Sequence, residues 1–250
     1  MKKILTYLIV TILPLYCFSQ EKIKVEYDYI VKLRPALTNN KSEEYKIELE
    51  KYLKIPEKHT LYYYNGNSFY KNAPKKSLVV DVSTEKVDAH YTVSKKQQYV
   101  SDTIRYYAFK NNDSITTWLS YPKMEKFYLR YKPLWTIKYL DETEKIDNYL
   151  CKAAELTLKN GEIQKIWYTE EIPLSTGPKQ YYGFPGLVLK VDTPKFVCYA
   201  TKISKDVKET DIEKLDPKLK VYYGEAYQKK LKEIQEVMSQ PIKTEKVINL

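Results

Sequence analysis

The sequence has 250 residues, of which 43% are hydrophobic and 30% are charged, and its formal net charge is +10. A chain of this length can bury enough apolar surface to fold without disulfides or a structural metal. Its lysines are spread along the chain instead of forming a stripe, which indicates a solvated basic surface, with attraction to anionic lipid headgroups or acidic cell-envelope polymers as the alternative.

The first 19 residues have the three parts of a secretory signal. Two lysines precede an apolar run at 4–15, which is too short to span a bilayer, and small residues stand at the cleavage positions before Gln20. A lipid anchor on Cys17 is disfavoured because the bulky Tyr16 stands where such signals carry a small residue. We therefore expect an exported protein of the periplasm or cell envelope, with no transmembrane segment and no nucleic-acid partner. Removal of the two lysines lowers the net charge from +10 to +8.

The first part of the mature sequence predicts a strand, a helix and a hairpin. Residues 23–33 alternate between apolar and polar side chains, as in a strand with one buried face. Apolar and aromatic residues within 40–55 recur at helical spacing and predict a short helix there. Asn65 and Gly66 separate two strand-like runs, and this pair is typical of a type I′ hairpin because both residues need a positive φ.

Later segments continue the strand pattern. The apolar pattern of residues 72–101 is mostly irregular and predicts a long connection. An alternating strand begins at Trp135, and an acidic turn is expected after it, at 141–144. Asn160 and Gly161 predict a second hairpin. The remaining strands are expected at 103–110, 114–120, 126–131, 146–158, 163–169, 187–191 and 196–203.

The pattern changes after the last of these strands. Residues 205–220 are charged and irregular, whereas 225–239 carry apolar residues at helical spacing. We expect this amphipathic helix to dock on the domain, with a membrane surface or a partner as the alternatives. The predicted domains are a signal peptide at 1–19, an antiparallel β domain at 20–204, and a charged linker with a C-terminal helix at 205–250. The predicted fold class is mainly β, with a curved antiparallel sheet that forms a half-barrel or a barrel-like shape.

Glycine is concentrated in residues 167–191, which hold three of the 6 glycines. This stretch predicts a shaped loop between two strands, in which Pro185 restrains φ and Gly186 permits a positive φ or the close approach of another backbone. Two interpretations are open: a tight bend that lays the sheet over the core, or an aromatic rim that contacts an apolar ligand or a partner. The candidate contacts are Trp167, Tyr181, Tyr182 and Phe184.

Two cysteines, Cys151 and Cys198, remain after the signal. An exported protein permits a disulfide between them. In a simple up-and-down sheet, however, their strands would lie three apart, so the sulfurs would meet only if the sheet closes or folds over. Both a disulfide and two buried thiols are therefore open, while the lack of a Cys-x-x-Cys spacing argues against a redox pair.

The sequence contains no evident set of residues for catalysis or metal binding. The two histidines, His59 and His90, have no second strong ligand at a metal-binding spacing, and no serine lies in a nucleophile motif. Adjacent acidic residues on a strand point to opposite faces and cannot act as a pair on one substrate. We therefore predict no metal, no cofactor and no catalytic residue.

One hexapeptide of the loop described above reads Gly183-Phe184-Pro185-Gly186-Leu187-Val188. Upstream of it stand three shorter motifs, Trp167-Tyr168-Thr169, Ile172-Pro173 and Gly177-Pro178. In these motifs and their order the chain resembles the GLPGLI family, a group of exported proteins of the Bacteroidota type, although phenylalanine and valine replace a leucine and an isoleucine. The resemblance implies an envelope-associated protein without an established activity, and it makes a disulfide of Cys151 less expected.

The predicted function is therefore that of an exported envelope protein that binds or assembles with an apolar ligand or a protein partner and is not an enzyme. One alternative is an accessory protein of an outer-membrane transporter, docked through a sheet edge or the terminal helix. The other is an envelope hydrolase whose carboxylates are brought together by folding.

Overall fold

The computed structural model describes residues 22–73, 75–86, 92–100, 114–118 and 124–239. The signal peptide predicted at 1–19 and the strand predicted at 103–110 lie outside the described residues. Within those residues the chain forms one large sheet, two small sheets and three α-helices.

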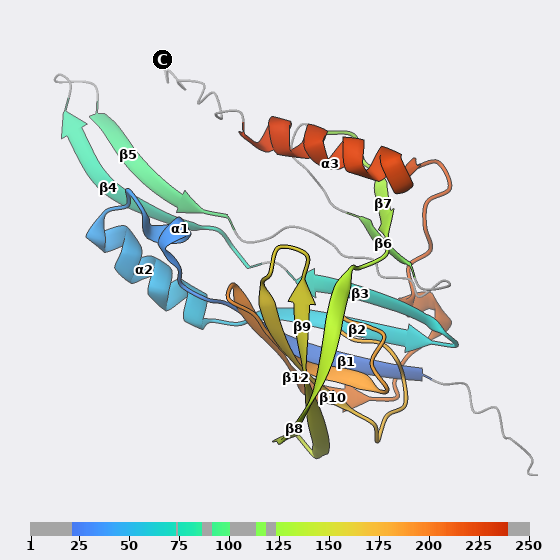
Figure 1. Cartoon of the computed structure of the whole chain (residues 1–250). Helices are drawn as coiled ribbons and strands as arrows, with labels where there is room; N and C mark the ends of the chain where they lie inside the picture. Colours follow the sequence, from blue (N-terminus) through green and yellow to red (C-terminus); the bar gives the residue numbers. More distant parts are fainter. Residues whose placement is uncertain (1–21, 74, 87–91, 101–113, 119–123, 240–250) are drawn as a thin grey trace, which may run out of the picture.

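The large sheet has eight strands, and every neighbouring pair is antiparallel. The strands are β1 (Lys22–Val31), β2 (Glu57–Tyr64), β3 (Asn67–Ala73), β8 (Trp135–Ile146), β9 (Tyr149–Leu158), β10 (Ile163–Thr169), β11 (Leu187–Asp192) and β12 (Phe196–Ser204). They lie in the order β3-β2-β1-β12-β11-β10-β9-β8, and the β8 end is steeply inclined to the β3 end (Figure 1). Among the described residues the sheet is open, so the mainly β prediction is confirmed and a closed barrel is excluded.

Strand β1 joins two parts of the chain that are far apart in sequence. It pairs with β2 on one side and with β12 on the other, so that Tyr27 stands opposite both His59 and Ala200. Residues directly opposite each other in a sheet share a face. The alternating apolar side chains of these strands therefore form one core, together with those of β9, β10 and β11.

Both predicted hairpins are confirmed. Asn65 and Gly66 have φ angles of 45° and 82°, as a type I′ turn requires, and they join β2 to β3. In the second hairpin Gly161 has a φ of 80°. The Leu158 N–H donates to the carbonyl oxygen of Glu162 at 2.9 Å and closes this turn between β9 and β10.

The acidic turn predicted at 141–144 is wrong. Strand β8 continues through this segment with a bulge between Tyr139 and Thr143, and the chain reverses only near Asp147, whose φ is 52°. Glutamates of the bulged segment pair instead with lysines of β10 and β11. Because the carboxylates find cations on neighbouring strands, the acidic run belongs to the sheet.

The helix predicted within 40–55 is α2 (Glu43–Lys54), which follows the short α1 (Pro35–Thr38). Ser42 caps α2, since its hydroxyl oxygen accepts a hydrogen bond of 3.2 Å from the Tyr45 N–H. The buried face of α2 packs against a hairpin of β4 (Leu78–Lys86) and β5 (Thr92–Tyr99).

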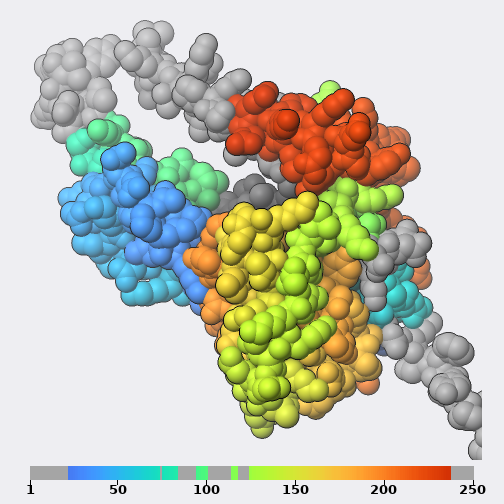
Figure 2. All heavy atoms as spheres, in the orientation of Figure 1, coloured from blue at the N-terminus to red at the C-terminus, as the bar shows by residue number. Residues whose placement is uncertain are grey.

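A separate hydrophobic cluster lies at the C-terminal end of the described chain. Helix α3 (Gly224–Ser239) buries Ile234 against Phe127 and Leu129. The small sheet beneath it consists of β6 (Ile115–Trp118), β7 (Tyr128–Tyr131) and β13 (Val221–Tyr222), and η1 (Glu209–Asp211) precedes β13. Figure 2 shows α3, in red, lying over the green residues of β7. In the described parts of the chain, no helix is both long and apolar enough to cross a bilayer.

Candidate functional site

The segment between β10 and β11 contains the hexapeptide and lies close to the sheet. The Val188 N–H donates to the carbonyl oxygen of Thr176 at 3.0 Å. Gly186 has no room for a side chain, because a Cβ there would lie 1.9 Å from the carbonyl oxygen of Thr169. This glycine is therefore required by a close backbone approach, which agrees with the bend interpretation.

The four candidate aromatic contacts lie in different surroundings. Tyr181 and Phe184 are buried in the main core, where the Tyr181 hydroxyl donates to Oε1 of Gln164 at 2.9 Å. Trp167 is 8% exposed, and the ammonium groups of two lysines lie over its ring. Tyr182 is half-buried. The burial of Tyr181 and Phe184 favours a packing role for these two rings.

Cys151 and Cys198 are buried free thiols, so the candidate disulfide is not formed. Cys151 lies on β9 and Cys198 on β12, and two strands separate them in a sheet that is open among the described residues. Burial raises the pKa of Cys151 to about 11 and the pKa of Cys198 to about 12. Both thiols are therefore protonated and unreactive near neutral pH.

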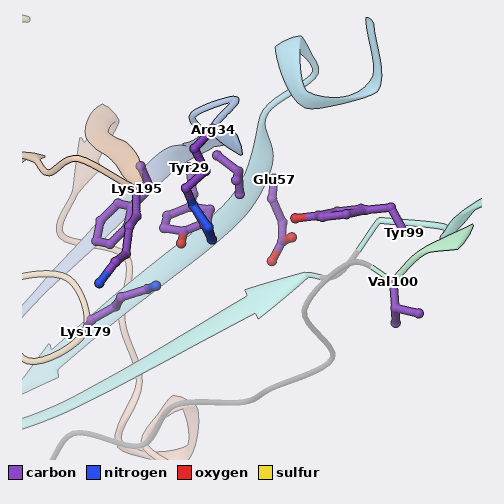
Figure 3. A pocket seen from close by; sticks show the side chains of 9 residues that line it. Tyr29, Arg34, Glu57, Tyr99, Val100, Lys179 and Lys195 are labelled. Atoms are coloured by element: carbon purple, nitrogen blue, oxygen red, sulfur yellow. The ribbon is translucent and has the colours of Figure 1, made fainter. Parts of the chain in front are cut away.

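A cavity of about 290 Å³ opens where the ends of β1, β2 and β12 meet. Figure 3 shows its wall, to which the end of β5, the loop before β11 and the turn before β12 also contribute. Its position on three paired strands gives the cavity a rigid base. The lining residues are Tyr29, Val31, Arg34, Glu57, Tyr99, Val100, Lys179, Lys195 and Phe196.

Three cationic side chains, those of Arg34, Lys179 and Lys195, reach this cavity. The Lys179 ammonium lies 4.2 Å from the centre of the Tyr29 ring, and Lys195 pairs with Glu162 at 3.0 Å. The Nε atom of Arg34 is buried and has no hydrogen-bond partner among the described residues. A buried donor without a partner costs about 1–3 kcal/mol, so an anion that accepted a hydrogen bond from this atom would remove that cost.

Glu57 is the one carboxylate in the described lining of the cavity, and its residue is 5% exposed. Its Oε1 atom accepts hydrogen bonds from Nε2 of His59 at 2.9 Å and from Nδ2 of Asn72 at 2.8 Å. Glu57 and His59 share a face of β2 because they are two residues apart. These bonds hold the carboxylate in place at the wall of the cavity.

His59 helps to fix the position of the Glu57 carboxylate through a hydrogen bond. A carboxylate only accepts hydrogen bonds, so Nε2 of His59 carries the proton, and Nδ1 accepts from the hydroxyl of Tyr70. The imidazole also stacks on the ring of Tyr29, with 4.7 Å between the ring centres. Burial lowers the pKa of His59, although the hydrogen bond to Glu57 acts in the opposite direction. The imidazole is therefore neutral near pH 7.

The sequence analysis did not identify Arg34, Glu57 or the two lysines as site residues. One signal was available, because Glu57 and His59 are polar residues on the face of β2 that also carries Leu61 and Tyr63. Polar groups on a buried face are usually hydrogen-bonded, and they often mark a site. Among the described residues, no three side chains of the metal-binding types His, Cys, Asp and Glu come together.

The fold and the cavity define an open antiparallel β protein with a small, cation-rich site at one end of its sheet. A family model described as "Protein of unknown function (Porph_ging)" matches residues 155–190, which include β10 and the loop that carries the hexapeptide. A search among curated proteins finds no match.

Two solved structures of PNGF-II are similar to this chain in fold. One, in space group C2, has a TM-score of 0.51 and 12% sequence identity and covers 86% of this chain. The other, in space group P21, has a TM-score of 0.51 and 16% identity and covers 85%. In both cases this chain spans only 33% of the PNGF-II chain. At such low identity the similarity shows the fold alone.

Proposed function

We propose that this chain is an exported binding protein without catalytic activity, and that it holds a small anionic ligand in the cavity beside β1, β2 and β12. The proposal is carried by Arg34, whose buried Nε has no hydrogen-bond partner among the described residues. An anion at this position would accept that donor and remove the cost of burying it. The planar guanidinium also matches a carboxylate or phosphate group, which it can bind with two parallel hydrogen bonds.

The charge and size of the cavity support the same ligand class. Arg34 and Lys179 line it against one described carboxylate, that of Glu57, while the third cation, Lys195, is paired with Glu162. The remaining surplus of positive charge favours a ligand with an anionic group. Its volume of about 290 Å³ corresponds to roughly ten water molecules, each with a share of about 30 Å³ in the liquid. A ligand of the size of a small metabolite fits this space.

This ligand differs from the apolar one that the sequence indicated, because four of the nine described lining residues are charged. The hydrolase alternative requires two carboxylates in one cleft, and the described lining contributes Glu57 alone. Binding is therefore favoured over catalysis.

Export is supported by the signal pattern at 1–19 and by the resemblance of the hexapeptide to an exported family.

The proposal is tested by native mass spectrometry of protein produced with its signal sequence and purified from the exported fraction without denaturant. We expect a bound small molecule that acid releases and that anion exchange retains. A protein that carries no such molecule, and whose melting temperature no anion from a metabolite extract raises, would refute the proposal.

The variant Arg34→Gln identifies the position of the ligand. Loss of one charge-assisted contact of about 2 kcal/mol weakens binding roughly 30-fold. Arg130→Gln is the matched control, because Nε of Arg130 donates to Oγ1 of Thr116 at 3.2 Å in the small sheet, outside the cavity lining. Equal affinities of the two variants would place the ligand elsewhere.

A further inference from the structure

Strand β8 forms one edge of the eight-stranded sheet. Among the described residues it pairs with β9 alone, and Figure 2 shows its residues, in yellow-green, on the surface of the molecule. The strand is 12 residues long, about twice the length of an average strand. A sheet edge carries a row of backbone N–H and C=O groups that a further strand can bind. The β8 edge is therefore a candidate interaction surface.

The first half of β8 directs alternate backbone groups toward the open edge. In β9, both the N–H and the C=O of Leu158 are used in hydrogen bonds of 2.9 Å that close the turn to β10. Trp135 stands opposite Leu158. In an antiparallel pair, a residue whose backbone groups point away from the neighbouring strand stands opposite one that does the same. The N–H and C=O groups of Trp135, Ile137 and Tyr139 therefore point away from β9.

The side chains of these three residues form an apolar face that the rest of the chain covers only in part. The ring of Trp135 stacks on that of Tyr181, with 6.1 Å between the ring centres, so this end of β8 is held on the core. Ile137 is half-buried, whereas Tyr139 is 53% exposed and the preceding Leu134 is 57% exposed. A strand added beyond β8 would remove this apolar area from water.

The second half of β8 is unsuited to pairing with a further strand. A bulge lies between Tyr139 and Thr143, and the residues at 141, 142 and 144 are acidic. Bulges and charged side chains are the features by which sheet edges avoid additional strands. Pairing is therefore limited to residues 135–139, in which Lys138 is the one charged residue.

We infer that the partner of this edge is a second copy of the chain, and that residues 135–139 of the two copies pair antiparallel about a two-fold axis at Ile137. In this register Ile137 stands opposite its own copy, and Trp135 stands opposite the partner's Tyr139. All three residues direct their backbone groups toward the partner, and the three pairs would form about six hydrogen bonds. The two aromatic pairs and the aliphatic pair add cross-strand contacts. The inference goes beyond the proposed function and does not depend on the cavity.

The residues of the edge favour this register over its two neighbours. An axis at Lys138 would place two ammonium groups directly opposite each other, which is destabilising. An axis at Thr136 would place Tyr139 opposite the partner's Pro133, which has no N–H to donate. With the axis at Ile137, Lys138 stands opposite the partner's Thr136, so no like charges meet.

Sedimentation velocity of the mature protein over a concentration series measures the association. We expect a reversible equilibrium of monomer and dimer with a Kd in the micromolar range, because the interface is small. Amide hydrogen exchange, followed by NMR at the same concentrations, should slow at Trp135, Ile137 and Tyr139 as the dimer forms. Exchange at Thr136 and Lys138 should not change, because their N–H groups already face β9.

The variants Thr136→Glu and Thr136→Lys test the register. Glutamate would stand opposite the partner's Lys138 at two symmetric positions and should lower the Kd about five-fold, whereas lysine should raise it about five-fold. Thr136 is exposed, so neither change should disturb the fold. Thr201 is the matched control, an exposed threonine of β12 with β9, β10 and β11 between it and the edge. Thr201→Glu and Thr201→Lys should leave the Kd unchanged.

Two results would overturn the inference. One is a protein that sediments as a monomer at every concentration up to about 1 mM. The other is a dimer whose Kd is changed in the same direction by Thr136→Glu and Thr136→Lys, or by neither, because such a dimer forms in another register or through another surface. Neither result bears on anion binding, which the mass of the bound ligand and the Arg34→Gln variant test separately.

Discussion

The hydroxyl of Tyr27 in β1 donates a hydrogen bond of 2.7 Å to the carbonyl oxygen of Val188 in β11. Strand β12 lies between these two strands in the sheet, so the side chain of Tyr27 reaches across β12 on the buried face. The sheet must bend here to bring the two groups together. The bond joins the first strand of the described chain to the last residue of the hexapeptide, 161 positions later.

Replacement of Tyr27 by phenylalanine should lower the free energy of unfolding by about 1–2 kcal/mol, because it removes a buried hydrogen bond and leaves a carbonyl group unpaired. Urea unfolding measures this change. Tyr139→Phe is the control, since Tyr139 is 53% exposed and its replacement should cost less than about 0.5 kcal/mol. Equal effects of the two variants would show that the Tyr27 bond contributes nothing specific.

Gly186→Ala should destabilise the protein by about 3 kcal/mol or more, because the new methyl group would lie 1.9 Å from the carbonyl oxygen of Thr169 and force the two backbones apart. Gly161→Ala meets no atom within 4 Å, and only its φ of 80° is unfavourable, so it should cost about 1–2 kcal/mol. Thermal unfolding of both variants checks this order. A smaller effect at Gly186 than at Gly161 would contradict the close approach.

The buried His59 should make the protein less stable in mild acid. Its pKa is lower in the folded protein than the ordinary 6.5, so the folded state binds fewer protons than the unfolded state once the pH falls below about 6.5. Stability is therefore complete above that pH and decreases as the pH falls toward the folded pKa. Urea unfolding at a series of pH values should show this decrease, and His59→Gln should flatten it.

The pKa of His59 can also be measured directly by NMR titration, in a background where His90→Gln leaves one histidine. The titratable groups that face the imidazole are Glu57, Tyr29, Tyr70 and the more distant Lys179. A pKa above 6.5 would mean that the attraction of Glu57 exceeds the effect of burial, and stability would then increase in mild acid.

Cys151 and Cys198 should resist alkylation while the protein is folded. Burial raises the pKa of Cys151 to about 11 and that of Cys198 to about 12, which leaves little thiolate at neutral pH. Iodoacetamide labelling followed by peptide mapping should modify both residues only after denaturation. A peptide in which Cys151 and Cys198 are joined by a disulfide would contradict the strand order of the sheet.

Local signals in the sequence were sufficient for the two hairpins with an Asn-Gly turn and for α2 and α3, but the hairpin of β4 and β5 was missed because most of 72–101 was interpreted as irregular. Asn65 and Gly66 determine their turn because few other residue pairs adopt its positive φ angles, and α2 and α3 follow from apolar residues at helical spacing. The turn near Asp147 was missed because a run of carboxylates was interpreted as a loop, although lysines on adjacent strands pair with two of them.

The strand order and the cavity could not be derived in the same way. The pairing of β1 with β12 joins residues such as Tyr27 and Ala200 that are more than a hundred positions apart, and no nearby residue encodes it. The cavity depends on that pairing, because Arg34, Glu57 and Lys179 meet only after β1, β2 and β12 are in register. The polar pair of Glu57 and His59 on a buried strand face was the one local indication.

The central claim, that the cavity beside β1, β2 and β12 binds an anion through Arg34, is tested most directly by a crystal structure. The protein should be purified from the exported fraction and crystallised without sulfate, phosphate or carboxylate buffers. The account predicts a small molecule whose anionic group lies within hydrogen-bond distance of the Arg34 guanidinium. A guanidinium paired with a carboxylate of the chain itself, in a cavity that contains only water, would contradict it.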